Sequence, residues 1–377
     1  MIPSPEPLDH LLGMHYMVLA AGLDVEVPEP REKSFIVVED PVILPGGDYI
    51  YAVVKQGVST PRMVYTLARR LRVRTSCITV AGLKDARATA LQYASVKKSC
   101  LENPPRVIRG PGFTAIMRGR GRVARGLVAG NRFAVRLCGP EAIEAGRLLS
   151  GRVLRLPAYY GYQRFGTRRP NTHVVGLLLA YDAEWLAALE AIDEPYPDEN
   201  PRIILSRILL KPSIDPERGM ARRVERLGVL RLSGVTPHGL MQLYFSALQA
   251  FIFNEYLSER IRQGYPLDER IDGEGRDEQG RPLAPVPGVD ACDSVRGEAR
   301  RLLEAVLARH GLELDSLRLF RRFGVAARTF TRPVYIDVSV DASVKDDCAW
   351  LVFRLEKGMY ASLILREVCK NIHKCVY

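Results

Sequence analysis

Strand-forming segments lie near both ends of this 377-residue chain, and a long stretch with helical spacing separates them. Residues 34–39 and 50–55 are rich in β-branched and aromatic residues, and residues 334–340 and 349–355 share this composition. From residue 171 to about residue 330, apolar residues recur mostly at helical intervals. The simplest architecture is therefore a discontinuous α+β domain with a mainly helical domain inserted into it.

The chain is long for a single hydrophobic core, which also favours two domains. We expect one domain to comprise residues 1–156 and 333–377, and the inserted domain to comprise residues 157–332. The turn residues between the strands at 34–39 and 50–55 predict that these two strands pair. Further strands are predicted at 77–80 and 133–137, and a loop is predicted over 272–290. One helix is predicted to begin after Thr60, which serves as its N-cap. The other predicted helices cover residues 141–149, 172–192, 239–262, 295–310 and 361–372.

The charge balance of the chain is strongly basic. Lys and Arg number 54 against 43 Asp and Glu residues, which gives a formal net charge of +11. Such a balance favours a polyanionic partner, most often nucleic acid, although a charge that serves only solubility is the alternative. Because no apolar run reaches the length of a bilayer span, we expect no membrane association.

The seven cysteines are scattered, odd in number and include no C-x-x-C pair. They predict reduced, mostly buried thiols and a cytoplasmic protein. Cys369, His373 and Cys375 lie close together near the C-terminus, but further ligands at the usual spacing are missing. We therefore predict no metal site.

The strand at 77–80 is followed by a glycine and then by the adjacent pair Lys84 and Asp85. A carboxylate placed just past a strand end, beside a fixed cation, is held ionised and can serve as a nucleophile. A surface ion pair in a turn is the simpler interpretation of these two residues alone. Polar residues recur after them, at Thr89, Gln92 and Ser95, which favours a site.

Two glycine-containing segments precede the strand at 133–137. Gly130 and Asn131 predict a tight turn, after which Asn131 could bind a base edge and Phe133 could stack on it, or Phe133 could simply fill the core. Upstream, a Gly/Arg-rich segment lacks the strand and helix of a dinucleotide-binding loop. It predicts either a solvated charged loop or a flexible loop whose guanidinium groups bind phosphates, formed by Arg118, Arg120, Arg122 and Arg125.

Aromatic residues alternate with glycine and arginine over residues 159–166. This composition is typical of RNA-contacting surfaces, but the same aromatic residues could pack at a hinge between the two domains. The candidate RNA-binding residues in and after this segment are Gln163, Arg164, Arg168 and Arg169.

Taken in order, these segments resemble the TruD family of tRNA pseudouridine synthases. The family pattern G-x-K-D-x-x-A-x-T-x-Q is matched from Gly82 to Gln92, except that Ala90 replaces the threonine and Thr89 stands one residue earlier. A second departure is Tyr162, where a small residue is expected. The likeness covers nearly the whole chain, and its further blocks are residues 130–133, 159–166, 251–254 and 358–362.

The resemblance implies a pseudouridine synthase catalytic domain with a mixed or antiparallel sheet and an inserted TRUD domain. It implies an isomerase that converts a uridine of tRNA, at position 13 or at position 35 of a tyrosine tRNA, into pseudouridine without a cofactor or a metal. By the match, Asp85 is the nucleophile and acts on a flipped base, supported by Lys84, while Phe133 and Asn131 bind the base. The alternative from another class is a noncatalytic RNA-binding or RNA-chaperone protein.

Overall fold

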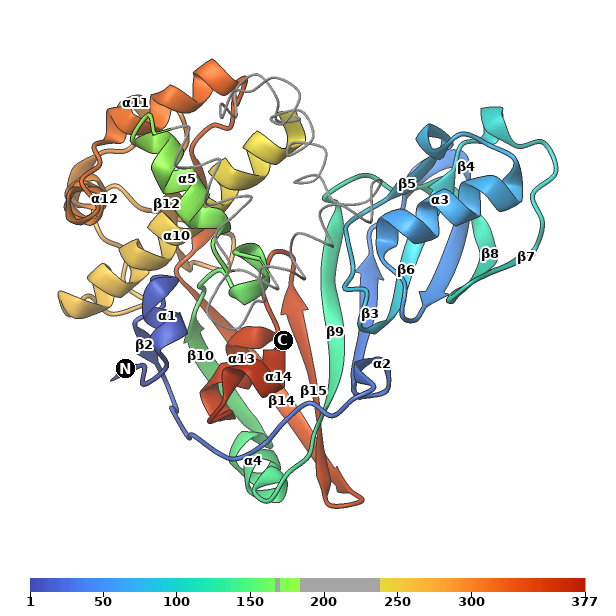
Figure 1. Cartoon of the computed structure of the whole chain (residues 1–377), viewed down its shortest axis with the longest axis horizontal. Coiled ribbons are helices and arrows are strands. Elements are labelled where there is room, and N and C mark those ends of the chain that lie inside the picture. Colours follow the sequence, from blue (N-terminus) through green and yellow to red (C-terminus); the bar gives the residue numbers. More distant parts are fainter. Residues whose placement is uncertain (167–169, 184–237, 377) are drawn as a thin grey trace, which may run out of the picture. The chain divides into compact units, whose positions relative to one another are not determined.

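The computed structural model describes residues 1–166, 170–183 and 238–376 (Figure 1). Contacts within the described residues divide them into two compact units. The sheet unit comprises residues 21–154 and 337–376, and the helical unit comprises the described residues of 1–20 and 155–336.

The first twenty residues were expected with the strands, but they pack within the helical unit. The side-chain amide of Asn254 donates to the carbonyl of Leu12 at 2.9 Å, and the backbone N–H of His15 donates to Ser258 Oγ at 3.1 Å. These polar contacts cannot be inferred from local sequence, because the two residues of each contact are more than 200 positions apart along the chain.

A ten-stranded mixed sheet organises the sheet unit, and the chain leaves this unit along β10 and returns along β14. The strand order is β10-β14-β15-β9-β3-β6-β4-β8-β7, with β5 paired to β6 beside this path. The strands are β3 (Phe35–Pro41), β4 (Leu44–Lys55), β5 (Ile78–Val80), β6 (Thr89–Val96), β7 (Val107–Gly110), β8 (Phe113–Arg122), β9 (Val128–Leu137), β10 (Arg152–Pro157), β14 (Tyr335–Lys345) and β15 (Cys348–Glu356).

The predicted pairing of the first two long strands is wrong. β6 lies between β3 and β4, parallel to β3 and antiparallel to β4. On its other side β3 pairs with β9, which in turn pairs with β15, both antiparallel. The segment that carries the candidate nucleophile thus leads directly into the centre of the sheet.

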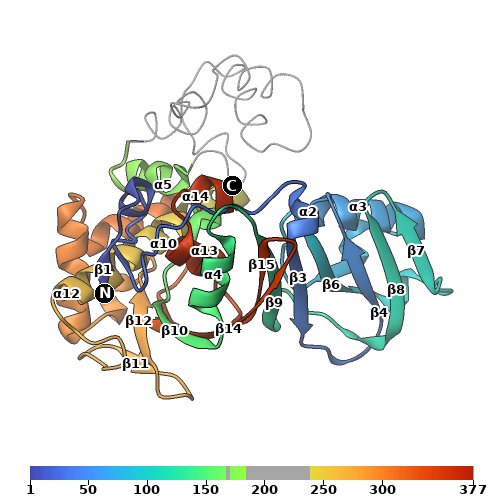
Figure 2. The ribbon, with the colours of Figure 1, turned by 90° about the horizontal axis from the view of Figure 1, so that it is seen from below.

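Helix α3 (Thr60–Leu71) covers one face of β4, β6 and β8, as Figure 2 shows. The N-cap of the helix is Ser59, one residue before the predicted cap Thr60. The side chain of Ser59 accepts a hydrogen bond from the backbone N–H of Arg62. Its apolar side, which includes Met63 and Leu67, packs with Tyr51 and other buried residues of these strands. Because Thr60 is not the cap, its hydroxyl group is available to other partners.

Short helices complete the sheet unit, and they include α4 (Ala142–Leu149), as predicted over 141–149. The helix predicted over 361–372 is instead divided into α13 (Ser362–Val368) and α14 (Ile372–Val376). The remaining helix is α2 (Arg31–Ser34).

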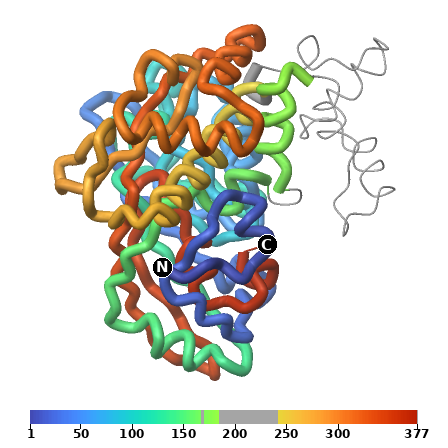
Figure 3. The backbone as a smooth tube through the Cα atoms, turned by 90° about the vertical axis from the view of Figure 1, so that its left-hand side faces the viewer, coloured from blue at the N-terminus to red at the C-terminus, as the bar shows by residue number. Residues whose placement is uncertain are grey.

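Helix α10 (His238–Arg262) forms the core of the helical unit and matches the helix predicted over 239–262. Buried residues such as Phe245, Leu248 and Phe253 line it on several sides, as expected for a central helix. Figure 3 shows α10 in yellow between α5 (Thr172–Ala180) in green and α12 (Gly297–Arg309) in orange. None of the helices in the described ranges is long and apolar enough to cross a membrane.

The predicted loop over 272–290 contains strands. They are β11 (Gly275–Arg276) and β12 (Pro282–Val286), which form a small sheet with β13 (Phe330–Pro333). The other elements of the unit are β1 (Ile2–Pro3), α1 (Pro7–Leu11), β2 (Tyr16–Met17), α11 (Ala291–Ser294) and 3₁₀ helices at Tyr162–Arg164 and Leu314–Phe323.

The prediction of reduced thiols is wrong for six of the seven cysteines. Disulfides join Cys77 to Cys100, Cys138 to Cys348 and Cys369 to Cys375, all in the sheet unit. Cys138 and Cys348 come together because their strands pair with Leu137 opposite Ala349. Such pairings follow from strand register, which cysteine spacing does not reveal. Cys292 is the free thiol.

Candidate active site

The segment around the candidate nucleophile forms a loop, residues 81–88, between β5 and β6. Asp85 lies in this loop and is exposed to solvent. Its Oδ1 atom accepts a hydrogen bond from the backbone N–H of Arg87 at 2.9 Å. Such an aspartate turn fixes the direction of the side chain and leaves the carboxylate at the surface, where a large substrate can reach it.

Side chains at the end of β4 and the start of α3 hold the backbone of this loop. Thr60 Oγ1 accepts from the N–H of Lys84 at 2.9 Å. The ammonium of Lys55 donates to the carbonyl of Asp85 and, at 3.0 Å, to the carbonyl of Val58. Because Lys55 is completely buried, the residue that carries the candidate carboxylate is anchored by a cation inside the unit.

Lys84 forms an ion pair with Glu39 rather than with Asp85. Its Nζ atom lies 2.7 Å from Glu39 Oε2, and both side chains are buried. The second oxygen of Glu39 accepts from the N–H of Tyr93 at 3.2 Å. The sequence suggests that Lys84 supports Asp85 directly. In the structure, Lys84 instead pairs with Glu39 and so fastens the loop to β3.

Lys55 is electrostatically coupled to the candidate nucleophile. Burial lowers the pKa of Lys55, the negative charge of Asp85 opposes this effect, and the positive charge of Lys84 adds to it. Lys55 is therefore a buried cation that contacts the backbone of Asp85, whereas Lys84, the supporting residue expected from the sequence, pairs with Glu39.

Two side-chain amides near the loop have unused hydrogen-bonding atoms. Asn131 lies in β9 directly across from Glu39, and its Oδ1 is buried with no partner among the described residues. The Nε2 atom of fully buried Gln92 likewise has no described partner, although Thr60 donates to its Oε1 at 3.2 Å. Since an unsatisfied buried polar atom is costly, these two atoms are candidates for hydrogen bonds to a buried water or to a ligand.

Phe133 lies in β9 and is only 9% exposed. Its ring stacks on Phe353 with the centroids 5.3 Å apart and an angle of 20° between the planes. Phe35 contacts the ring edge-on at 6.0 Å. The stacking partner of Phe133 in this structure is therefore another phenylalanine of the sheet, and together they form an aromatic cluster on the face that carries Asn131.

The predicted basic loop is wrong in its conformation, because Arg118, Arg120 and Arg122 lie in strand β8. All three are exposed, as is Arg125 in the turn that follows. The guanidinium of Arg120 lies 4.9 Å from the ring centroid of Tyr49 and donates to the carbonyl of Gly47 at 3.2 Å. The arginines are thus displayed on a strand rather than on a flexible loop.

The aromatic segment at 159–166 belongs to the helical unit and is mostly core. Tyr159, Tyr162 and Phe165 are completely buried, which supports the packing interpretation for these rings. Gln163 is exposed, and Arg164 stacks over Tyr160 with 5.7 Å to the ring centroid. Arg168 and Arg169 lie outside the described residues.

Sequence reasoning did not assign Glu39, Lys55 or Thr60 to the site. A signal for the first two is present, since each continues the inward-facing positions of an apolar strand. Glu39 follows Phe35 and Val37 at intervals of two, and Lys55 ends the buried run of β4. A charged residue in such a register needs a partner inside the protein, which is a reason to search for one.

The family model for tRNA pseudouridine synthase D (TruD) matches residues 13–277 and 275–368 of the chain. Among curated proteins, a probable tRNA pseudouridine synthase D of Pyrobaculum neutrophilum is 31% identical over 413 residues and covers 98% of each chain. The protein of the same name from Methanopyrus kandleri is 29% identical over 355 residues and covers 86% of each.

A solved structure from Methanosarcina mazei, titled as a tRNA pseudouridine synthase D (TruD), superimposes with a TM-score of 0.69 at 26% identity. The superposition covers 97% of this chain and 98% of that one. These matches confirm both the predicted α+β fold class and the resemblance to the TruD family.

Proposed function

The chain belongs to the tRNA pseudouridine synthase D (TruD) family and is therefore an isomerase that acts on tRNA, and we propose that Asp85 is the nucleophile of its reaction. The observation that carries this proposal is the anchoring of its loop. The carboxylate is exposed, while the carbonyl of the same residue is fixed by buried Lys55. An exposed carboxylate on a rigid backbone is preorganised for attack.

The reaction is an isomerisation whose atoms balance within uridine. The bond between N1 and C1′ of uridine breaks, the base rotates, and C5 bonds to C1′. One proton leaves C5 and one is gained by N1, so no group is lost and no redox change occurs. The Asp85 carboxylate can attack C1′ or C6, or stabilise a glycal intermediate. Consistent with this balance, the proposal includes neither a metal nor a cofactor.

The uracil base would bind between the unused amide atoms and the aromatic cluster. Asn131 Oδ1 can accept from the imide N–H of uracil, which cytosine lacks. Phe133 would offer its ring to the base after its contact with Phe353 opens. A target uridine inside folded tRNA must first flip out, which costs a few kcal/mol, and stacking returns about 1–3 kcal/mol.

The remaining proposed contacts are with the tRNA backbone. Exposed arginines on β8 match phosphate oxygens, and the target would be uridine 13 or uridine 35 of a tyrosine tRNA. Lys84 would act indirectly, by fastening the loop to Glu39. Because tRNA is the substrate, we also propose a cytoplasmic location. The full set of residues proposed to contact RNA is Arg118, Arg120, Arg122, Arg125, Gln163, Arg164, Arg168 and Arg169.

The test compares wild type with Asp85→Asn, which keeps the size of the side chain and removes its charge. We expect the variant to bind tRNA normally and to form no pseudouridine, as read by carbodiimide-induced primer stops along the tRNA. Asp182→Asn is a matched control, since Asp182 is exposed and lies in the helical unit. Full activity in Asp85→Asn would reject Asp85 as the nucleophile. Loss of pseudouridine formation in both Asp85→Asn and Asp182→Asn would show that the loss is not specific to Asp85.

A further inference from the structure

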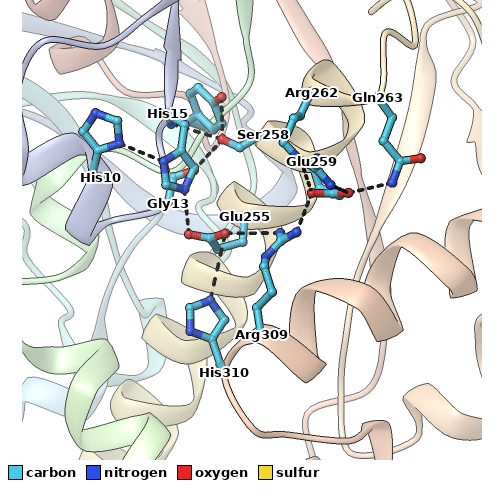
Figure 4. A network of polar contacts seen from close by, with 11 residues as sticks. His10, Gly13, His15, Glu255, Ser258, Glu259, Arg262, Gln263, Arg309 and His310 are labelled. Atoms are coloured by element: carbon cyan, nitrogen blue, oxygen red, sulfur yellow. Dashed lines mark hydrogen bonds and ion pairs between the residues drawn. The ribbon is translucent and has the colours of Figure 1, made fainter.

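A hollow of about 750 Å³ lies in the helical unit, where α10 and α12 end, and most of the residues that line it have polar or charged side chains. Its lining includes residues of the N-terminal segment and the last residues of both helices, Arg262 and Arg309. Figure 4 shows two glutamates of α10 at the centre of its polar contacts. No residue of the candidate active site lines this hollow.

The two glutamates orient the arginines. Arg262 donates to Glu259 through Nε at 2.9 Å and through Nη2 at 2.6 Å. Arg309 donates to the same carboxylate at 2.5 Å and lies 3.6 Å from Glu255. Both glutamates are buried, at 7% and 1% exposure, whereas the arginine side chains are 61% and 41% exposed. The carboxylates therefore lie behind the guanidinium groups, which face the solvent.

Two histidines of the hollow are held in place by polar contacts. His10 Nε2 lies 2.8 Å from the carbonyl of Ser4, His15 Nε2 lies 2.8 Å from Glu255, and the two Nδ1 atoms lie 2.9 Å apart. These contacts hold the N-terminal segment against Glu255 of α10.

Glu255 remains ionised near neutral pH. Burial raises the pKa of Glu255, but the contacts with His15 at 2.8 Å and His310 at 3.9 Å outweigh burial and lower it to about 2. The charges of the two glutamates are balanced by Arg262 and Arg309. An anion that enters the hollow therefore meets exposed guanidinium groups, in front of carboxylates that are already neutralised by their partners.

A second hollow of about 580 Å³ shares Tyr16 and Arg262 with the first. Arg155 lines it, with its guanidinium 4.4 Å from the ring centroid of Tyr335 and an ion pair to Asp268 at 2.9 Å. Arginines held by carboxylates and interleaved with tyrosines therefore continue from one hollow into the next. An extended anion fits this arrangement better than a compact one.

We propose that these two hollows bind a segment of tRNA backbone, with Arg262 and Arg309 contacting phosphate groups. The inference rests on tRNA being the substrate, and it adds a binding site in the helical unit to the proposed site in the sheet unit. A guanidinium held along one edge by a carboxylate offers its other N–H groups in a fixed direction, which suits phosphate oxygens. Arg262 fulfils this condition, because its Nη1 has no hydrogen-bond acceptor among the described residues.

The first test measures tRNA binding by Arg262→Gln over a range of salt concentrations. Arg301→Gln is the matched control, since Arg301 is 80% exposed on α12 and pairs with Glu298 at the same three-residue spacing. We expect Arg262→Gln to weaken tRNA binding about three- to tenfold and to lower the salt slope by about one. The control Arg301→Gln should bind tRNA and turn it over as wild type does. Equal binding by the two variants would overturn the inference.

The second test uses the wild-type protein, so it does not depend on the folding of a variant. Phenylglyoxal modification is followed by mass spectrometry with tRNA, with adenosine monophosphate, with inorganic phosphate or with no addition. Protection of Arg262 and Arg309 by tRNA, with no protection of Arg301, supports the site. Protection by the small phosphates alone assigns the hollows to a free phosphate ligand and overturns the RNA assignment, as does the absence of any protection.

The result is separable from the proposed function. If Arg262 proves irrelevant to tRNA binding while Asp85→Asn abolishes pseudouridine formation, only the site in the helical unit is rejected. If Asp85→Asn stays active, the nucleophile is rejected and the tRNA site in the helical unit is judged by its own binding data.

Discussion

Lys84 Nζ lies 2.7 Å from Glu39 Oε2, in an ion pair whose two side chains are 8% and 1% exposed. The pair joins the loop that presents Asp85 to the central strand β3. A pair so well shielded from water is costly to break, because the remaining charge loses both its partner and its hydration. The position of the candidate nucleophile therefore depends on a contact with a residue 45 positions earlier in the chain.

Replacing Glu39 by Gln leaves the Lys84 ammonium buried without a full negative charge beside it. We expect E39Q to lower the free energy of unfolding by about 3 kcal/mol. Glu39→Gln combined with Lys84→Met should cost less than Glu39→Gln alone, because no charge is then left unpaired. Urea unfolding followed by circular dichroism measures both values. Equal losses in the single and double variants would show that the pair has no energetic coupling.

Lys55→Met removes the buried ammonium that holds the carbonyl of Asp85. Since displacement of a catalytic group by about 1 Å can reduce turnover by about a hundredfold, we expect kcat to fall by about ten- to a hundredfold. The dissociation constant for tRNA should not change, because buried Lys55 cannot contact the RNA. Lys345→Met, at an exposed position on β14, is the control. A higher dissociation constant with unchanged kcat would contradict the positioning role.

Much of the fold could be predicted from local pattern, because apolar residues at helical spacing predict α10 and the helix start that follows Gly139 predicts α4. The errors cluster at glycines inside strands. At Gly121 a Cβ would lie 2.5 Å from Ile43 Cγ2, and at Gly130 it would lie 2.4 Å from the carbonyl oxygen of Leu355. Both glycines allow a neighbouring segment of the sheet unit to approach closely. From the sequence alone, however, Gly121 is predicted to lie in a loop and Gly130 in a tight turn.

The candidate site was predictable only in part, for a related reason. The exposed carboxylate of Asp85 follows from its place just past a strand end. The partner of Lys84 does not, since Glu39 reaches it only through the parallel pairing of β3 with β6. Lys55 and Thr60 likewise act across the fold, from residues that are distant in sequence. Local pattern thus located the candidate nucleophile, while the contacts that hold its loop depend on tertiary structure.

Reduction of the disulfides should destabilise the sheet unit. Cys138–Cys348 closes the largest loop, with a sequence separation of 210 residues, for which the chain-entropy model gives about 5 kcal/mol. We expect a phosphine reductant to lower the urea midpoint of unfolding for wild type, and to lower it less for Cys138→Ser combined with Cys348→Ser, in which only the two disulfides that close shorter loops are left to reduce.

Cys292→Ser is the control for the disulfides, because Cys292 is the free cysteine. It should respond to the reductant as wild type does. Thiol titration of unfolded protein should detect one thiol before reduction and seven afterwards, in accord with the three disulfides. Seven thiols in the unreduced protein would contradict all three pairings.

Glu255 makes stability depend on pH in the acidic range. Its folded-state pKa is lowered to about 2 from an ordinary value of 4.5, so it stabilises the fold above pH 4.5 and loses this effect as the pH falls toward 2. The difference corresponds to about 3 kcal/mol. Since protonated glutamate resembles glutamine, the gap in unfolding free energy between wild type and Glu255→Gln should be largest at pH 6 and should shrink by pH 3. Glu304→Gln, at a half-exposed ion pair on α12, should show a small gap at both values. A gap for Glu255→Gln that is independent of pH would mean that its effect comes from packing rather than from charge.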